Sequence, residues 1–408
     1  MNLVALNIDS IPLGQPLPFV LRGADGALLA QKGFVIRNRD ELSVMVSRGL
    51  QLCVDTDESG DSHRAYLAQL QQMLLSDTSL GQIASMKISA GAQADRAGDA
   101  PAFPDWPELQ LRATQLLRSP QAPDFLARFH ALHDDLVRYG TQAPDATLLA
   151  LIFLSAQETR MYSATHAMLV ASVTMLCARE TLRWPPDRVQ RVGQAALSMN
   201  IAMTALQDQL ALQTQPLTSE QIHAIEGHAN RAEAMLRHIG VTDADWLEAV
   251  RNHHHRTPGP LADKSPGMQM ARLIQRADVF GARISPRATR HPMPVTAAMQ
   301  ASYYDESQQV DEAGAALVKT VGVYPPGAFV RLASQEVGVV LRRGSSATTP
   351  RVAVVLNRNG MPTGEPIPRD TAQAQWKIAA PVAQRDVRAQ FPLQRLLALV
   401  EPAHRATK

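Results

Sequence analysis

The stretch from Tyr162 to Thr181, YSATHAMLVASVTMLCARET, decides the fold of the largest part of this chain. Its apolar side chains recur at the i, i+3, i+4 and i+7 spacing of an α-helix. The pattern predicts a long apolar helix with His166 on its first turns. A histidine there is usually a core residue that a neighbour satisfies, so His166 alone indicates no function.

Segments with the same spacing surround this helix, from Pro107 to about Met299. They cover residues 124–138, 145–159, 186–207, 218–239, 243–254 and 267–284. The clearest helix start is Thr218, which has Gln221 three positions later in a capping-box pattern. The middle of the chain is therefore predicted to be a bundle of α-helices.

The N-terminal part is predicted to be a small α+β module over residues 1–60. Asp25-Gly26 stands between two apolar runs, which predicts a hairpin. A short helix over residues 40–49 and a strand over residues 50–54 complete the module.

A connecting segment is predicted over residues 61–106. It contains a helix over residues 62–75 and a linker over residues 77–105, which is rich in Ala, Gly, Ser, Asp and Pro. The helical domain is predicted to follow over residues 107–305.

Residues 306–408 are predicted to form a C-terminal extension. A helix after Gly314 gives way to strand-like segments divided by Gly and Ser, at residues 329–332, 337–341 and 352–356. We expect a small β-rich lobe with a polar tail.

The composition is that of a folded protein without a strong charge bias. Of the 408 residues, 45% are apolar and 19% are charged, so a core can form. The formal charge of +2 gives no reason to propose duplex nucleic acid or a membrane surface as the main partner.

The two cysteines and the N-terminus indicate the compartment. Cys53 and Cys177 are too few for a disulfide framework and lack the spacing of a zinc site. The N-terminus lacks a basic stretch followed by an apolar core, and no apolar run approaches ~18 residues. We therefore expect a cytoplasmic protein.

Histidines are concentrated in the helical part of the chain. Seven of the twelve fall between residues 166 and 255, namely His166, His223, His228, His238, His253, His254 and His255. His253-His254-His255 closes a predicted helix, where the partial negative charge of the helix end favours a cation or a metal. Asp278 is the carboxylate of an apolar helix and is costly to bury unless it is paired, hydrogen-bonded or ligating.

A metal site is predicted from residues on four successive helices. Its candidate ligands are His166, His228, His253, His254 and Asp278. Imidazole and carboxylate are the ligands that first-row divalent metals prefer, and helix bundles build such sites from facing helices. Core histidines and a surface histidine run remain the alternative interpretation.

Arg287 and Arg290 follow Asp278 and are candidate phosphate ligands. A guanidinium at a helix end beside a metal suits a phosphate. Two solvated loop arginines are the alternative.

The order of these motifs resembles the HD-GYP domain. The matching positions are Tyr162-x3-His166, Leu217-Thr218-x-Glu220-Gln221 leading to His228, His253-His254, Ala277-Asp278-Val279-Phe280, Arg287 and Arg290, and Tyr324-Pro325-Pro326-Gly327. The resemblance covers roughly residues 145–345, and residues 14–56 resemble the N-terminal module of some relatives. It implies a mainly α protein, with an HD-type helical bundle between the α+β module and the β-rich lobe.

The resemblance implies a function in bacterial signalling by c-di-GMP. Family members cleave this cyclic dinucleotide at a two- or three-metal site. His166, His228, His253, His254 and Asp278 fall at metal positions of the family, so a divalent metal such as Fe or Mn is implied. His223, His238 and His255 are then expected on the helix surface or in loops.

Both signature motifs of the family are altered in this chain. Met199 and Asn200 align with the His and Asp of the naming dyad, and Met203 aligns with the Lys that follows it. Asn200 lacks the charge of a carboxylate that bridges two metals, and a thioether suits Cu(I) better than Fe or Mn. Residues 256–261 stand, shortened, in place of the GYP loop.

Three functions remain open at this point. The first is a catalytically impaired protein that binds c-di-GMP, a related cyclic dinucleotide or a protein partner in signalling. The second is an active metal-dependent phosphodiesterase with one metal on His228, His253 and His254, because a three-His site with an open position can activate water. The third is an interaction module in which the helices only link the two lobes.

One further motif is expected to carry no function. His133-Asp134 is the chain's His-Asp dipeptide, but it precedes His166 and stands on a mixed helix with Asp135, Arg128 and Arg138 nearby. We expect both residues on a solvated helix face.

Overall fold

The computed structural model describes residues 3–5, 17, 20–23, 26, 28–30, 34, 36, 52–55, 104–157, 159–256, 259–387 and 391–400. The chain divides into two compact units, Met1–Ala102 and Phe103–Lys408. Among the described residues, no helix is both long enough and apolar enough to span a membrane.

The first unit contains a four-stranded antiparallel sheet of order β1-β4-β2-β3. Its strands are β1 Leu3–Ala5, β2 Leu21–Gly23, β3 Leu28–Ala30 and β4 Leu52–Asp55. The predicted hairpin is present between β2 and β3, with Gly26 at a φ of 80° in the turn, a conformation that favours glycine. The helices predicted at 40–49 and 62–75 and almost all of the 77–105 linker lie outside the described residues.

The second unit begins with the predicted helical bundle. Its helices are α4 Trp106–Leu117, α5 Phe125–Gln142, α6 Pro144–Ser155, α7 Tyr162–Glu180, α8 Pro186–Ser198, α9 Thr204–Leu212, α10 Ser219–Glu226, α11 His228–His238, α12 Ala244–Asn252, α13 Pro266–Ile284, α14 Val295–Tyr303 and α15 Glu312–Val321. Short 3-10 helices, η3 Ile201–Met203 and η4 Leu261–Asp263, join some of them.

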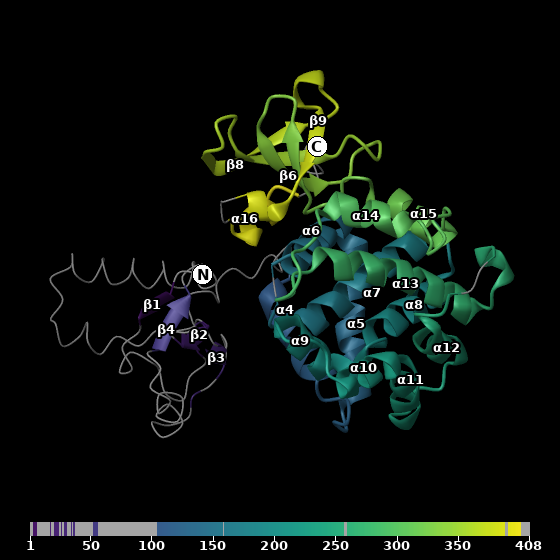
Figure 1. The fold of residues 1–408 in the computed structure, drawn as a ribbon. Coiled ribbons are helices and arrows are strands. Elements are labelled where there is room, and N and C mark those ends of the chain that lie inside the picture. The colour runs from purple at the N-terminus through teal and green to yellow at the C-terminus, as the bar shows by residue number, and fades with distance from the viewer. Residues whose placement is uncertain are drawn as a thin grey trace, which may run out of the picture. The chain divides into compact units, whose positions relative to one another are not determined.

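Helix α7 lies in the middle of this bundle (Figure 1). Every residue from Tyr162 to Ala178 is buried, and α7 packs against α4, α5, α6, α8, α13 and α15. A helix without a polar face must be covered on all sides to keep its apolar surface from water. The long apolar helix predicted from the sequence is therefore confirmed as the core of the unit.

Two predicted helices are each divided in the structure. Residues 186–207 form α8, η3 and the start of α9, and residues 218–239 form α10 and α11. The second break occurs at Gly227, which ends α10 because glycine has low helix propensity. These breaks place Met199 at the end of α8 and His228 at the first residue of α11.

The C-terminal lobe is a five-stranded antiparallel sheet of order β8-β7-β6-β5-β9. Its elements are β5 Phe329–Leu332, β6 Val337–Arg342, β7 Arg351–Leu356, β8 Pro362–Asp370, β9 Ile378–Val382 and the short helix α16 Leu393–Leu397. The lobe packs on the bundle through α6, which contacts β6 and α16 (Figure 1).

The strand-like segments identified in the sequence end at residue 356, whereas the structure has two further strands, β8 and β9. Strands β8 and β9 form the two edges of the sheet, and both contain proline. An edge strand tolerates proline because half of its backbone groups need no partner strand. It also keeps much of its surface in water, so the apolar alternation that reveals an inner strand is weak here.

Candidate functional site

Three histidines converge where α11 begins and α12 ends. His228 is the first residue of α11, His253 caps the end of α12, and His254 follows it. Their potential ligand atoms all lie within 4.8 Å of one another. His228 and His253 are buried and His254 is exposed, so the cluster is held by the protein on one side and faces solvent on the other.

The hydrogen bonds of the buried pair leave two ring nitrogens free to bind a metal. His228 Nδ1 donates to the carbonyl of Ile225, and His253 Nδ1 donates to the carbonyl of Val250 at 2.6 Å. In neutral imidazoles each Nε2 is then an unprotonated acceptor. The two Nε2 atoms lie 3.1 Å apart, so their lone pairs face each other.

Burial keeps this pair neutral. It lowers the pKa of His253 to about 3, assisted by the neighbouring His254, and burial also lowers the pKa of His228. Two neutral imidazoles with opposed lone pairs repel unless a cation lies between them. Because the Nδ1 hydrogen bonds orient both rings, as they do for metal-bound histidines in general, the residues present fit a divalent metal.

Local capping places the histidines at the end of α12. The Asp243 side chain accepts from the backbone N–H of Trp246, which starts the helix. The indole of Trp246 donates to Ser198 Oγ at 2.9 Å and so ties α12 to α8. The helix then ends at Asn252, where unpaired carbonyls give partial negative charge beside His253.

The other two predicted ligands form a separate pair. His166, on α7, donates through Nε2 to Asp278 Oδ1, on α13, at 2.7 Å. Burial acts to raise the pKa of Asp278, but the hydrogen bond and charge of His166 and the nearby imidazoles outweigh it. The pKa of Asp278 therefore lies well below its usual range. Of the five predicted ligands, the structure brings three within reach of one ion and pairs the remaining two.

Tyr162 joins this pair to one of the candidate phosphate ligands. Its ring stacks on His166, with centroids 5.7 Å apart and an interplanar angle of 9°. Its hydroxyl accepts from Arg287 Nη2 at 2.9 Å, and the Arg287 guanidinium lies 5.1 Å from the ring centroid. From the sequence, Tyr162 was identified only as the first residue of a motif. Its spacing of one helical turn from His166 could have predicted the ring contact.

Arg287 and Arg290 do not converge on the site. Their backbones form a β-bridge in the loop after α13. Arg287 reaches Tyr162, whereas Arg290 is exposed and its guanidinium donates to the carbonyl of Ala282. Only Arg287 therefore lies beside the His166–Asp278 pair.

The altered dyad lies next to α11. Met199 is fully buried in the apolar core, and Met203 is half-buried. Asn200 is also buried, and its Oδ1 has no hydrogen-bond partner among the described residues. Because η3, which follows Asn200, packs on α11, this unpaired oxygen lies in the neighbourhood of the helix that begins with His228.

The prediction that His133 lies on a solvated face is wrong. The Asp134 side chain is 75% exposed, but that of His133 is only 1% exposed. Consecutive helical residues point about 100° apart, so His133 faces inward on the same side as Phe129 and Leu136. Burial lowers the pKa of His133 to about 4, against the opposing effect of Asp134.

The other three histidines between residues 166 and 255 lie on the surface, as the sequence predicts. His223, His238 and His255 are exposed on α10, on the last turn of α11 and after α12, respectively. None of the three belongs to the group whose ligand atoms converge.

Comparisons with known proteins give two matches. No family model matches the chain. A Pseudomonas aeruginosa protein named cyclic di-GMP phosphodiesterase PA4108 is 29% identical over 229 residues, which are 55% of this chain and 54% of that protein. The chain thus matches about half the length of this curated relative.

A solved structure is also similar. It is described as Bd1817, a HDG"Y"P protein from Bdellovibrio bacteriovorus, and the match covers 78% of this chain and 98% of that chain. The sequences are 14% identical and the TM-score is 0.42.

Proposed function

We propose that this chain, which belongs to the HD-GYP family, binds a cyclic dinucleotide of the c-di-GMP type at a one-metal centre and has little or no hydrolytic activity. The observation that supports the proposal is the opposed pair of Nε2 lone pairs on His228 and His253, 3.1 Å apart. With His254 beside them, these residues suit one divalent ion, with Fe or Mn as the candidates.

Loss of the second metal is part of the proposal. The sequence offers Met199 and Asn200 where the family's dyad would supply an imidazole and a bridging carboxylate. Met199 is packed in the apolar core, and an amide cannot supply the negative charge that two dications require. The carboxylate of Asp278 is already hydrogen-bonded to His166.

Each group of side chains then has a distinct task. The three histidines would hold the ion, which supplies positive charge for a phosphate oxygen of the ligand. Arg287, held by the Tyr162 hydroxyl, would donate to a second phosphate oxygen through its remaining N–H groups. Exposure of His254 leaves the centre open to a ligand from solvent.

A second candidate is an active phosphodiesterase with a reduced metal site. It is favoured by the three-His arrangement, because catalytic metal sites keep three protein ligands and one open position. Asp278 lies close enough to His253 and His254 for their charges to interact, so a carboxylate is available near the centre.

Metal analysis and nucleotide assays separate the two candidates. Protein expressed anaerobically with Fe or Mn is analysed for metal, titrated with c-di-GMP by calorimetry and assayed for linear product. We expect about one metal per chain, c-di-GMP binding and no turnover above background. Turnover that disappears in His254→Ala and persists in His255→Ala would instead establish the active candidate, and absence of both metal and ligand binding would reject both.

Restoring the dyad tests why activity is low. The double variant Met199→His, Asn200→Asp is expected to raise the metal content from about one toward two per chain and to introduce measurable linearisation. Met199→His alone is the control, because it lacks the bridging carboxylate. A folded double variant, verified by thermal unfolding, whose metal content does not rise would contradict the proposed reason for the missing metal.

A further inference from the structure

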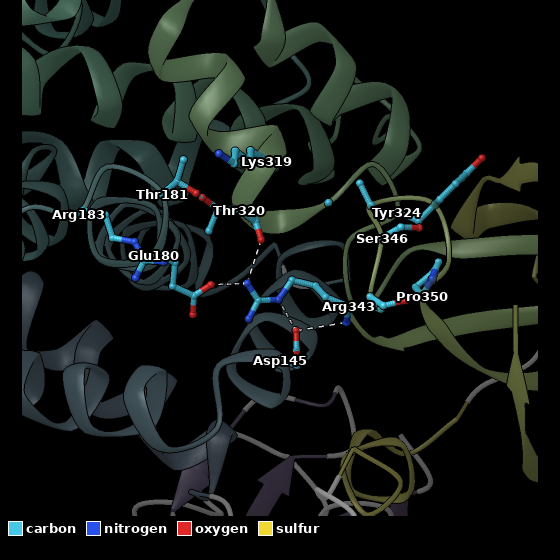
Figure 2. A pocket seen from close by; sticks show the side chains of 14 residues that line it. Asp145, Glu180, Thr181, Arg183, Lys319, Thr320, Tyr324, Arg343, Ser346 and Pro350 are labelled. Carbon is cyan, nitrogen blue, oxygen red and sulfur yellow. Dashed lines mark hydrogen bonds and ion pairs between the residues drawn. The ribbon is translucent and has the colours of Figure 1, made fainter. Parts of the chain in front are cut away.

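One cavity of the second unit contains an ion-pair network of its own side chains. It has a volume of about 550 Å³ and lies where α7, α15 and the β6–β7 loop meet (Figure 2). Arg343 binds Asp145 at 2.6 Å and Glu180 at 2.7 Å, and it donates to the carbonyl of Thr320 at 2.9 Å (Figure 2). Its guanidinium thus ties the C-terminal lobe to the bundle, and it engages both acidic residues of the cavity lining.

A smaller cavity in the C-terminal lobe is lined by three arginines. Its volume is about 300 Å³, at the lower end of the range for small-molecule sites. Arg342 of β6, Arg351 of β7 and Arg369 of β8 line it, and Asp370 is the acidic residue in its lining. Arg351 and Arg369 each have a carboxylate partner, Asp370 and Glu336, so among the described residues of this lining the uncompensated positive charge is that of Arg342.

The strand register adds to this charge. Arg342 lies directly opposite Arg351 on the neighbouring antiparallel strand. Like charges in such a pair destabilise a sheet. Arg351 is offset by Asp370 at 2.8 Å, but the Arg342 side chain has no ion-pair partner within the part of the chain that the structure describes.

Arg369 also lines the cavity and lies beside an aromatic ring. Its guanidinium lies 4.8 Å from the ring centroid of Trp376 and 3.3 Å from Glu336. Its Nε is buried and makes no hydrogen bond with any described residue. The half-buried Trp376, with Leu341 and Val352, forms the apolar side of the cavity.

We infer that this cavity binds a small nucleotide, with the base against Trp376 and the phosphate between Arg342 and Arg351. A paired guanidinium fork matches the oxygens of a phosphate, and base stacking on an aromatic ring is favourable for every base. A bound dianion also relieves the repulsion between the two opposed arginines. The site lies entirely in the β-rich lobe and does not depend on the histidine centre.

Calorimetric titration of the full chain with 5′-GMP tests this inference, with guanosine and inorganic phosphate as separate probes. We expect 5′-GMP to bind more tightly than either fragment. Arg342→Ala should weaken 5′-GMP at least tenfold, and Arg342→Lys, which keeps the charge and loses the fork, should weaken it less. Arg358→Ala, an exposed arginine in the β7–β8 turn, is the matched control and should leave the affinity unchanged.

A variant in the helical domain distinguishes binding in the lobe cavity from binding at the histidine centre. His253→Ala should leave 5′-GMP affinity unchanged if the nucleotide occupies the lobe. Loss of 5′-GMP binding in His253→Ala, or full binding by a folded Arg342→Ala, would overturn the inference. Absence of binding at millimolar 5′-GMP would do the same, as would equally tight binding of inorganic phosphate, because the base would then contribute nothing.

Discussion

The His228–His253–His254 cluster and the His166–Asp278 pair use the same kinds of side chain for different chemistry. In the cluster, backbone carbonyls accept the Nδ1 protons, so the Nε2 lone pairs of His228 and His253 point at each other. In the pair, His166 Nε2 donates a hydrogen bond to Asp278 Oδ1 at 2.7 Å. One arrangement needs a cation, whereas in the other the Nε2 of His166 already has a carboxylate partner, and its buried Nδ1 makes no hydrogen bond with any described residue.

The comparison shows that the partner of a histidine decides its availability. A carbonyl three residues earlier in the chain orients the ring and leaves the other nitrogen free for a metal. In the His166–Asp278 pair, the carboxylate instead accepts a hydrogen bond from Nε2, so neither this nitrogen nor that carboxylate oxygen is free to bind a metal. A count of histidines and carboxylates therefore overstates how many ligands a single ion can have here.

The largest expected effect is on the metal affinity of the His228–His253–His254 cluster. His253→Ala removes one of the two opposed lone pairs and should lower the affinity for Mn²⁺ at least 100-fold, or about 3 kcal/mol. Competition with a metal-sensitive dye measures this directly. His255→Ala, which removes an exposed neighbouring imidazole, should change the affinity little. Equal losses in the two variants would mean that the cluster is not the metal site.

His133, a buried histidine beside the exposed Asp134, extends the comparison to stability. His133 makes no hydrogen bond with any described residue, and Nδ1 is 3.7 Å from Asp134. Its pKa is about 4 in the folded chain and near 6.5 when unfolded. Between these values the unfolded chain binds more protons, so the free energy of unfolding should fall as the pH drops from 6.5 to 4 and should be insensitive to this group above 6.5.

Denaturant titrations across this pH range test the contribution of His133. His133→Gln should reduce the pH dependence by up to about 3 kcal/mol, at about 1.4 kcal/mol per pKa unit. His130→Gln, an exposed position on the same helix, serves as the control. Because His228 and His253 also have lowered pKa values, part of the slope should persist; an unchanged slope in His133→Gln would contradict the assignment.

The smallest expected effect is on the pair's connection to Arg287. Tyr162→Phe keeps the ring that stacks on His166 and removes the hydroxyl that accepts from Arg287. Affinity for c-di-GMP should fall about threefold to tenfold, or about 1 kcal/mol, while Mn²⁺ affinity is retained. Tyr304→Phe, at an exposed tyrosine, should change neither quantity. A parallel loss of metal affinity would place Tyr162 in the metal centre instead.

The helical bundle could be predicted from the sequence because buried helix faces require apolar residues at a helical spacing. The apolar spacing of residues 162–181 predicted α7, and the capping box at Thr218 marked the start of α10, where the structure has both of its hydrogen bonds. The edge strands β8 and β9 lack a clear apolar alternation in the sequence, since much of their surface faces water and both contain proline.

The candidate metal ligands could be proposed from the sequence, but their division into two groups in the structure could not. Ligand type and helix position follow from the chain itself, and they identified His166, His228, His253, His254 and Asp278. The error at His133 arose because a helix buries one of two adjacent polar residues, and only the neighbouring helices determine which one.

Local spacing and side-chain chemistry predict where most of the helical segments lie and which side chains can bind a metal or a phosphate, because neither depends on distant parts of the chain. The tertiary structure alone decided which of them meet. His166 and Asp278 are 112 residues apart in the chain, and Tyr162 and Arg287 are 125 apart. Such contacts form only when α7 is enclosed by the other helices, since packing and not local pattern sets the final few ångströms between side chains.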